Sequence, residues 1–139
     1  MGDKSVLTLF ELDESTVVRA TPAGRNTMNS LHRMARSLNS PGYFIGQSVD
    51  DIGDEKIRNN IGYKFCFKTT DIKEIRKVLE YYKLEENESN IEMLSNLENG
   101  VCLFQDHEGR TAVIALDSIF EEYDRGLDTR PTKQASGGE

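Results

Sequence analysis

The stretch that most constrains the fold is the apolar run Val6–Leu12, which ends directly on two carboxylates, Asp13 and Glu14. A run of strand length with little alternation between polar and apolar residues is typical of a buried parallel strand. In open α/β sheets, ligands bind in the crevice outside the carboxyl ends of such strands. The sequence therefore predicts an α/β fold with an acidic pair at the ligand-binding edge of its sheet.

The acidic pair has two interpretations. After a strand, an aspartate can hold a magnesium ion on a bound phosphate, and a neighbouring acidic residue can orient or deprotonate the attacking water. Asp13 and Glu14 are candidates for these two roles. Acidic residues after a strand also begin turns or cap helices, and this structural interpretation applies to the pair equally.

The length and the net charge of the chain indicate one acidic domain. A chain of 139 residues is long enough to bury a core. Its formal net charge of −7 argues against broad non-specific binding to DNA or to an anionic membrane, because both are negatively charged. Cys66 and Cys102 lack the spacing of metal ligands, so we expect two reduced thiols. No apolar stretch approaches the length of a membrane span.

A helix is predicted after the acidic pair, with Thr21 as its N-cap and Pro22 in the first helical position. At about 100° per residue, Arg36 lies close to Arg25 on one flank of the apolar stripe, whereas Arg33 points nearly away from it. Basic residues on a helix are usually solvated. Beside a nucleotide crevice they are also candidates for contacts with a phosphate or a neighbouring subunit.

A second short buried strand, Tyr43–Gly46, is followed by Gln47. If both strands lie in one sheet, Gln47 and Glu14 emerge at the same edge. A carboxamide there can sense a γ-phosphate or orient water, or it can simply bond the next loop. The acidic loop that follows does not match a calcium-binding loop. Helix capping by Asp54, ahead of the short helix that carries Arg58, explains it better.

The remaining sequence continues the alternation of strands and helices. In the helix that follows Asp71, Glu74 and Lys77 fall on the solvated side. Residues 128–139 lack apolar anchors, so we expect a loose tail. We expect four strands in one mostly parallel sheet flanked by helices, with a fifth strand antiparallel at its edge after a hairpin: Val6–Leu12, Tyr43–Gln47, Tyr63–Lys68, Val101–Gln105 and Thr111–Leu116.

The order of these motifs resembles the C-terminal half of the RecA-like motor ATPases of conjugation and type IV secretion, the VirB-type and TraC-type family. Leu9–Glu14 resembles the Walker B strand of that family. Gly24–Ser48 resembles its next helix and the strand that bears its sensor glutamine. The resemblance implies a RecA-like P-loop NTPase half-domain over residues 1–127. It lacks the Walker A part, because no G-x-x-x-x-G-K-[ST] phosphate loop occurs in the chain.

The resemblance also implies roles for individual residues. Asp13 would coordinate Mg²⁺ through water, Glu14 would be the general base, and Gln47 would sense the γ-phosphate. One of three arginines would supply an arginine finger to the neighbouring subunit: Arg36, Arg33 or Arg58.

Cofactor, partners and location follow from the same resemblance. The implied cofactor is Mg-ATP, bound by the intact parent protein. The implied partners are other subunits of a hexameric ATPase and a membrane secretion or conjugation complex, without direct sequence-specific binding to nucleic acid. The implied location is the cytoplasm, peripheral at the inner face of the membrane.

Two functions remain open. Without the phosphate loop, the backbone N–H groups and the lysine that hold the phosphates are missing, so we expect the chain alone to bind Mg-ATP weakly or not at all. The chain is either a fragment of an ATP-hydrolysing motor or a non-catalytic interaction module derived from the same fold.

Overall fold

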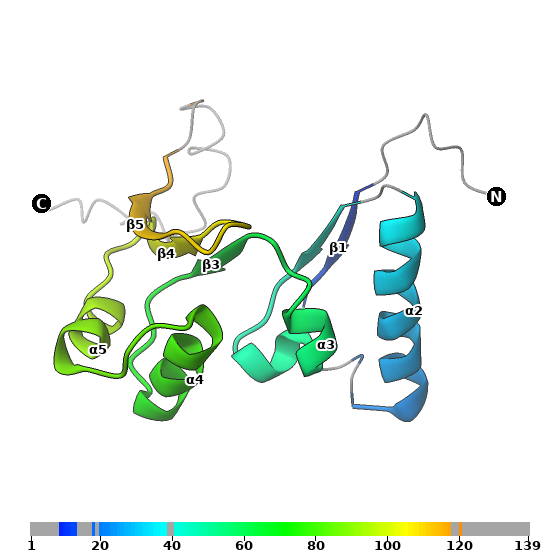
Figure 1. Cartoon of the computed structure of the whole chain (residues 1–139), viewed down its shortest axis with the longest axis horizontal. Coiled ribbons are helices and arrows are strands. Elements are labelled where there is room, and N and C mark those ends of the chain that lie inside the picture. Colours follow the sequence, from blue (N-terminus) through cyan, green and yellow to red (C-terminus); the bar gives the residue numbers. More distant parts are fainter. Residues whose placement is uncertain (1–8, 14–17, 19, 39–40, 118–119, 121–139) are drawn as a thin grey trace, which may run out of the picture.

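The computed structural model describes residues 9–13, 18, 20–38, 41–117 and 120. The elements in chain order are β1 (Phe10–Leu12), α2 (Pro22–Leu38), β2 (Gly42–Phe44), the 3-10 turn η1 (Val49–Ile52), α3 (Glu55–Arg58), β3 (Lys64–Cys66), α4 (Ile72–Tyr82), α5 (Glu88–Ser95), β4 (Val101–Gln105) and β5 (Thr111–Ala115). In Figure 1, α2 flanks β1 on one side of the molecule, and α4 and α5 lie beneath β3, β4 and β5 on the other. The predicted tail, residues 128–139, lies outside the described residues.

The strands β1 and β2 form a parallel pair, in which Phe10 is opposite Gly42 and Leu12 is opposite Phe44. The helix α2 connects them, and its predicted N-cap is confirmed, because the Gly24 N–H donates to Thr21 Oγ1 at 3.1 Å. The register of β1 and β2 confirms the predicted parallel pairing of these two strands. The strand β2 ends at Phe44, earlier than predicted.

The prediction of one mostly parallel sheet is wrong for the described residues. The strands β3, β4 and β5 form a separate sheet in which both pairings are antiparallel. The direction of β4 follows from the connection: two helices, α4 and α5, separate it from β3, so the chain returns in the opposite direction. A single crossover helix would have made β3 and β4 parallel. The β4–β5 hairpin is as predicted, with Gly109 at a φ of 83° in its loop.

The core of this second sheet lies between β4 and the helix α4. The apolar stripe of α4 packs with Leu94 and Leu103, and the buried set comprises Ile75, Val78, Leu79, Tyr82, Leu94, Leu97 and Leu103. Hydrogen bonds join the same elements: Tyr82 Oη donates to Leu103 O at 3.3 Å, and Gln105 Nε2 donates to Tyr82 O at 2.8 Å. These contacts make α4 and the antiparallel sheet one packed unit.

Candidate phosphate-binding edge and its supporting loop

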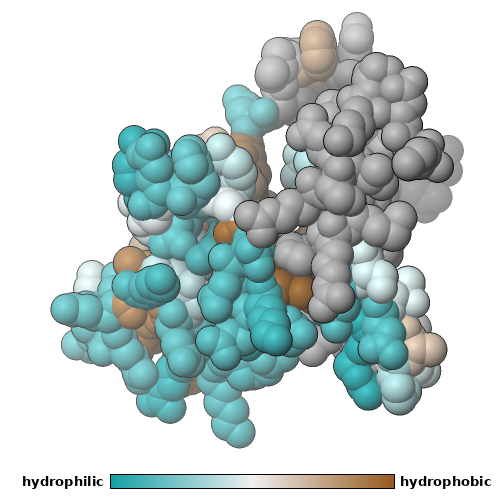
Figure 2. Space-filling model, turned by 45° about the vertical axis from the view of Figure 1, so that its right-hand side comes forward, coloured by the Kyte–Doolittle hydropathy of each residue, from teal (hydrophilic) through white to brown (hydrophobic). Residues whose placement is uncertain are grey.

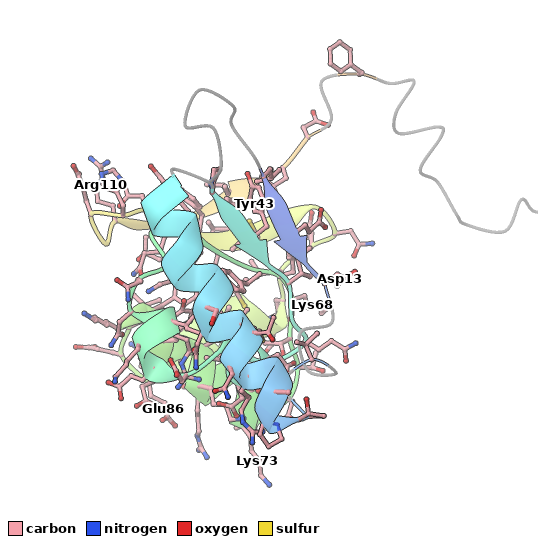
Figure 3. All side chains as sticks on the ribbon, turned by 90° about the vertical axis from the view of Figure 1, so that its right-hand side faces the viewer. Asp13, Tyr43, Lys68, Lys73, Glu86 and Arg110 are labelled. Carbon is pink, nitrogen blue, oxygen red and sulfur yellow. The ribbon has the colours of Figure 1, made fainter. Side chains whose placement is uncertain are left out.

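The parallel register of β1 and β2 brings their carboxyl ends to the same edge. Asp13 follows β1 directly and is exposed, and Figure 3 shows it at the tip of that strand. Gln47 follows β2 and is also exposed. Glu14 lies outside the described residues, so its expected position beside Gln47 stays a prediction. The structure thus brings together the two strand ends on which the predicted site depends.

The three candidate arginines lie on two helices. Arg33 and Arg36 are in the second half of α2, and their side chains are outside the described part of the chain. Arg58 is on α3, and its side chain is only 24% exposed. Its Nη1 lies 3.3 Å from Asp50 Oδ1 and 3.4 Å from Val49 O. Arg58 therefore supports η1 within this chain, and its role as an arginine finger stays a prediction.

The loop after Gln47 is held by a carboxylate that the sequence did not indicate. Glu74, on α4, accepts hydrogen bonds from Ser48 Oγ at 2.9 Å and from Val49 N at 2.6 Å. Its side chain is 15% exposed, so its expected place on the solvated side of the helix is wrong. Nothing local signals this contact, because Glu74 and Ser48 lie far apart in the sequence. The contact ties the predicted sensor loop to α4, the helix that packs against the second sheet.

Asp50, in the acidic loop around η1, pairs with two cations of the same chain. Lys77 Nζ lies 2.6 Å from Asp50 Oδ2, and Arg58 contacts the other oxygen of Asp50. The hydrogen bond from Lys77 holds the pKa of Asp50 below its usual value, and the same bond raises the pKa of Lys77. Asp54 caps α3 as predicted, accepting from Ile57 N at 3.0 Å. Within the described residues, no group of three or more His, Cys, Asp or Glu side chains is arranged to hold a metal ion.

Replacing Glu74 with Gln tests this support. We expect the free energy of unfolding to fall by about 1–3 kcal/mol, because two hydrogen bonds lose their charged acceptor. The exchange of the Val49 amide hydrogen should accelerate. Urea unfolding and amide exchange measure the two effects.

The matched control for this substitution is Glu80→Gln, on the exposed side of the same helix. It should change the free energy of unfolding by less than about 0.5 kcal/mol. Equal effects of the two substitutions on Val49 exchange would refute the supporting role of Glu74.

A cleft of about 1030 Å³ separates β2 from β3. Its walls are residues 41–49 and 60–69, and Val78, Tyr81 and Tyr82 of α4 contribute to its lining. Figure 2 shows hydrophobic residues at the middle of one face of the molecule, between hydrophilic surfaces. Lys64, Lys68 and Glu74 are the charged residues of this lining. Lys64 Nζ donates to Gln105 Oε1 at 2.7 Å and to Tyr81 O at 3.1 Å. Burial lowers the pKa of Lys64.

The two thiols are free, as predicted. Cys102 is buried and Cys66 is half-buried. Burial raises the pKa of Cys66 to about 11 and also raises the pKa of Cys102. Both are therefore protonated at neutral pH, and they are poor nucleophiles and poor metal ligands.

Comparison with known proteins places the chain in a class. Residues 1–127 match the sequence model of the AAA-like domain family, and the chain belongs to this family. More particularly, it is similar to the uncharacterized protein YddE of Bacillus subtilis (strain 168). The two are 31% identical over 128 residues, which are 92% of this chain and 15% of YddE.

A solved structure shares the fold. VirB4 of Thermoanaerobacter pseudethanolicus superposes with a TM-score of 0.65 and 19% sequence identity, over 87% of this chain and 34% of that one. The resemblance to the VirB-type family is thereby confirmed at the level of family and fold. The chain spans only a minor part of both relatives. Of the described helices, none is long and apolar enough to cross a membrane.

Proposed function

We propose that this chain is the Walker B half of a RecA-like motor ATPase of conjugative DNA transfer or type IV secretion. The observation that carries the proposal is the parallel β1–β2 pair, which directs Asp13 and Gln47 to one edge of the sheet in a chain of the AAA-like family. Similarity to VirB4 supports the same class of motor. Residues 1–127 would then form a partial ATPase domain that takes part in a hexamer at the inner face of the membrane.

The residues at this edge suit Mg-ATP only in part. An exposed carboxylate at a strand end is the oxygen ligand that Mg²⁺ prefers, and Asp13 would hold the ion through water. Bound Mg²⁺ would neutralise charge on the phosphates. The backbone N–H groups and the lysine of a phosphate loop have no counterpart in the sequence. This chain therefore supplies one half of a binding site.

Each remaining residue has a distinct role in the proposed hydrolysis. Glu14 would take the proton from the attacking water, and Gln47 would contact the γ-phosphate or orient that water. An arginine finger would stabilise charge on a neighbouring subunit's nucleotide. Arg36 and Arg33 are the better candidates, because Arg58 already contacts Asp50.

The alternative is a non-catalytic module that docks on a partner through the same half-fold. It is favoured by the missing phosphate loop and by the pairing of Arg58 within the chain.

Calorimetric titration with Mg-ATP separates the two functions. We expect the isolated chain to bind negligibly, because the phosphate loop supplies most of the contacts to the phosphates. The second titration uses a joined protein, in which the YddE region that precedes the matched segment is placed ahead of Met1. We expect this YddE region to carry the phosphate loop. This joined protein should bind Mg-ATP with micromolar affinity. Micromolar binding by the isolated chain, or no binding by the joined protein, would contradict the proposal.

A further inference from the structure

We propose that Glu74 is a positioning residue for Gln47. Its carboxylate holds the loop after β2, so that the Gln47 amide stays at the edge of the sheet where Asp13 also lies. The inference rests on the proposed function, in which Gln47 contacts the γ-phosphate or orients the attacking water. Glu74 itself touches neither the nucleotide nor the water and acts only through the loop.

The loop that carries Gln47 takes its shape from local contacts with Asp51. Before Gln47, Gly46 lies so close to Asp51 that an added Cβ atom would be 2.7 Å from Asp51 Cβ. After Gln47, Ser48 N donates to Asp51 Oδ2 at 2.9 Å, and Ser48 caps the turn η1. Because the Gln47 side chain is exposed, the backbone on its two sides determines where its amide lies. These contacts shape the loop without attaching it to another element.

Glu74 attaches the loop to the helix α4. One carboxylate oxygen, Oε2, accepts a hydrogen bond from Ser48 Oγ at 2.9 Å, and the other, Oε1, accepts one from Val49 N at 2.6 Å. The two residues held in this way are the first two after Gln47. A carboxylate that accepts one hydrogen bond at each oxygen constrains both the distance and the orientation of the groups that it binds.

The helix α4 is a well-anchored support for this contact. Ile75, directly after Glu74, and Val78 one turn further on are buried in the core of the second sheet. The Glu74 side chain is itself largely shielded from water, so water competes little for its oxygens. Charged hydrogen bonds in such a place are stronger than neutral ones in water. The core of the second sheet therefore sets the position of Gln47 through one side chain.

Lys77 supports the carboxylate of Glu74. Its Nζ lies 3.5 Å from Glu74 Oε2 and 2.6 Å from Asp50 Oδ2. The cation thus contacts both the carboxylate that holds the loop and a carboxylate of η1, and its charge offsets the repulsion between them.

The position of Gln47 matters because of the role proposed for it. A displacement of about 1 Å at a group that orients a reactant can cost about 10²-fold in rate. Release of Ser48 and Val49 would let Gln47 move, whereas Asp13 and the phosphate loop, which hold Mg-ATP in the proposed function, would stay in place. We therefore expect the loss of the Glu74 carboxylate to lower kcat and to leave nucleotide affinity nearly unchanged.

Steady-state ATP hydrolysis by the joined protein tests the inference. Glu74→Gln should lower kcat at least about tenfold, while KM for Mg-ATP changes by less than about twofold. The matched control Glu80→Gln, on the exposed side of the same helix, should change neither quantity. Rates are expressed per folded molecule, measured by circular dichroism, so that a loss of stability is not counted as a loss of rate. Equal kcat values for the two variants would overturn the inference.

A double substitution separates positioning from general support of the site. If Glu74 acts through Gln47, Glu74→Gln should lower kcat when Gln47 is present and change it little in a protein that already carries Gln47→Ala. Equal fold losses in the two backgrounds would show that Glu74 supports the site as a whole, and would overturn the inference.

Substitutions at Ser48 test the same contact without changing α4. Ser48→Ala removes the hydroxyl group that donates to Glu74 and should lower kcat. Ser48→Thr keeps a hydroxyl group and should retain the rate of the unmodified joined protein. Equal kcat values for Ser48→Ala and Ser48→Thr would overturn the inference even if Glu74→Gln failed to fold.

The outcomes distinguish this inference from the proposed function. No hydrolysis by the unmodified joined protein would refute the proposed function, and this inference with it. Hydrolysis that Glu74→Gln leaves unchanged would refute the positioning role and retain the ATPase. The YddE region is also added as a separate polypeptide, so that a joined protein that fails to fold leaves the test intact.

Discussion

Replacing Glu14 with Gln in the protein that joins this chain to the YddE phosphate-loop region should lower ATP turnover by about 10²-fold or more. Nucleotide affinity should change little, because Gln keeps the size of the side chain and the phosphate loop makes most of the phosphate contacts. Loss of the carboxylate removes the group that takes the proton from water. Steady-state hydrolysis and Mg-ATP titration measure the two quantities separately.

Glu11 provides the matched control for this prediction. It is an exposed glutamate within β1, before the strand reaches the predicted site. Glu11→Gln should leave turnover unchanged. In the non-catalytic alternative, the joined protein hydrolyses no ATP and Glu14→Gln changes nothing. Turnover by the isolated chain that Glu14→Gln abolishes would show that this half alone carries a working site.

Replacing Ile75 with Ala should lower the free energy of unfolding by about 2–5 kcal/mol. Ile75 is 0% exposed and lies in the core between α4 and the antiparallel sheet. The substitution removes buried methyl groups and leaves a cavity that a packed core closes only in part. For a domain of this size, such a loss is a large fraction of the total stability. Urea unfolding followed by circular dichroism measures it.

Ile72→Ala is the control, with the same change of side chain one turn earlier on α4. Ile72 is 45% exposed, so we expect a change below about 1 kcal/mol. Comparable losses for both substitutions would mean that α4 does not pack as the structure describes.

Local signals in the sequence determined the elements and their ends. Thr21 and Asp54 were predictable as caps because a cap uses a side chain and an N–H only two or three residues away. The apolar runs located β4 and β5, and the glycine of their loop predicted the hairpin. The acidic end of β1 and the polar end of β2 were predictable for the same reason, because each depends on neighbouring residues.

Only the tertiary structure decided how these elements combine. The sequence does not encode locally which strands pair or in which direction, so the antiparallel pairing of β3 with β4 is seen only in the folded structure. Glu74 reaches Ser48 and Val49 because α4 packs beside η1, and no local pattern marks such a distant partner. The cleft has the same origin. Aromatic residues such as Phe65 predict a strand, but only the fold decides which strand edges have no second neighbour among the described residues.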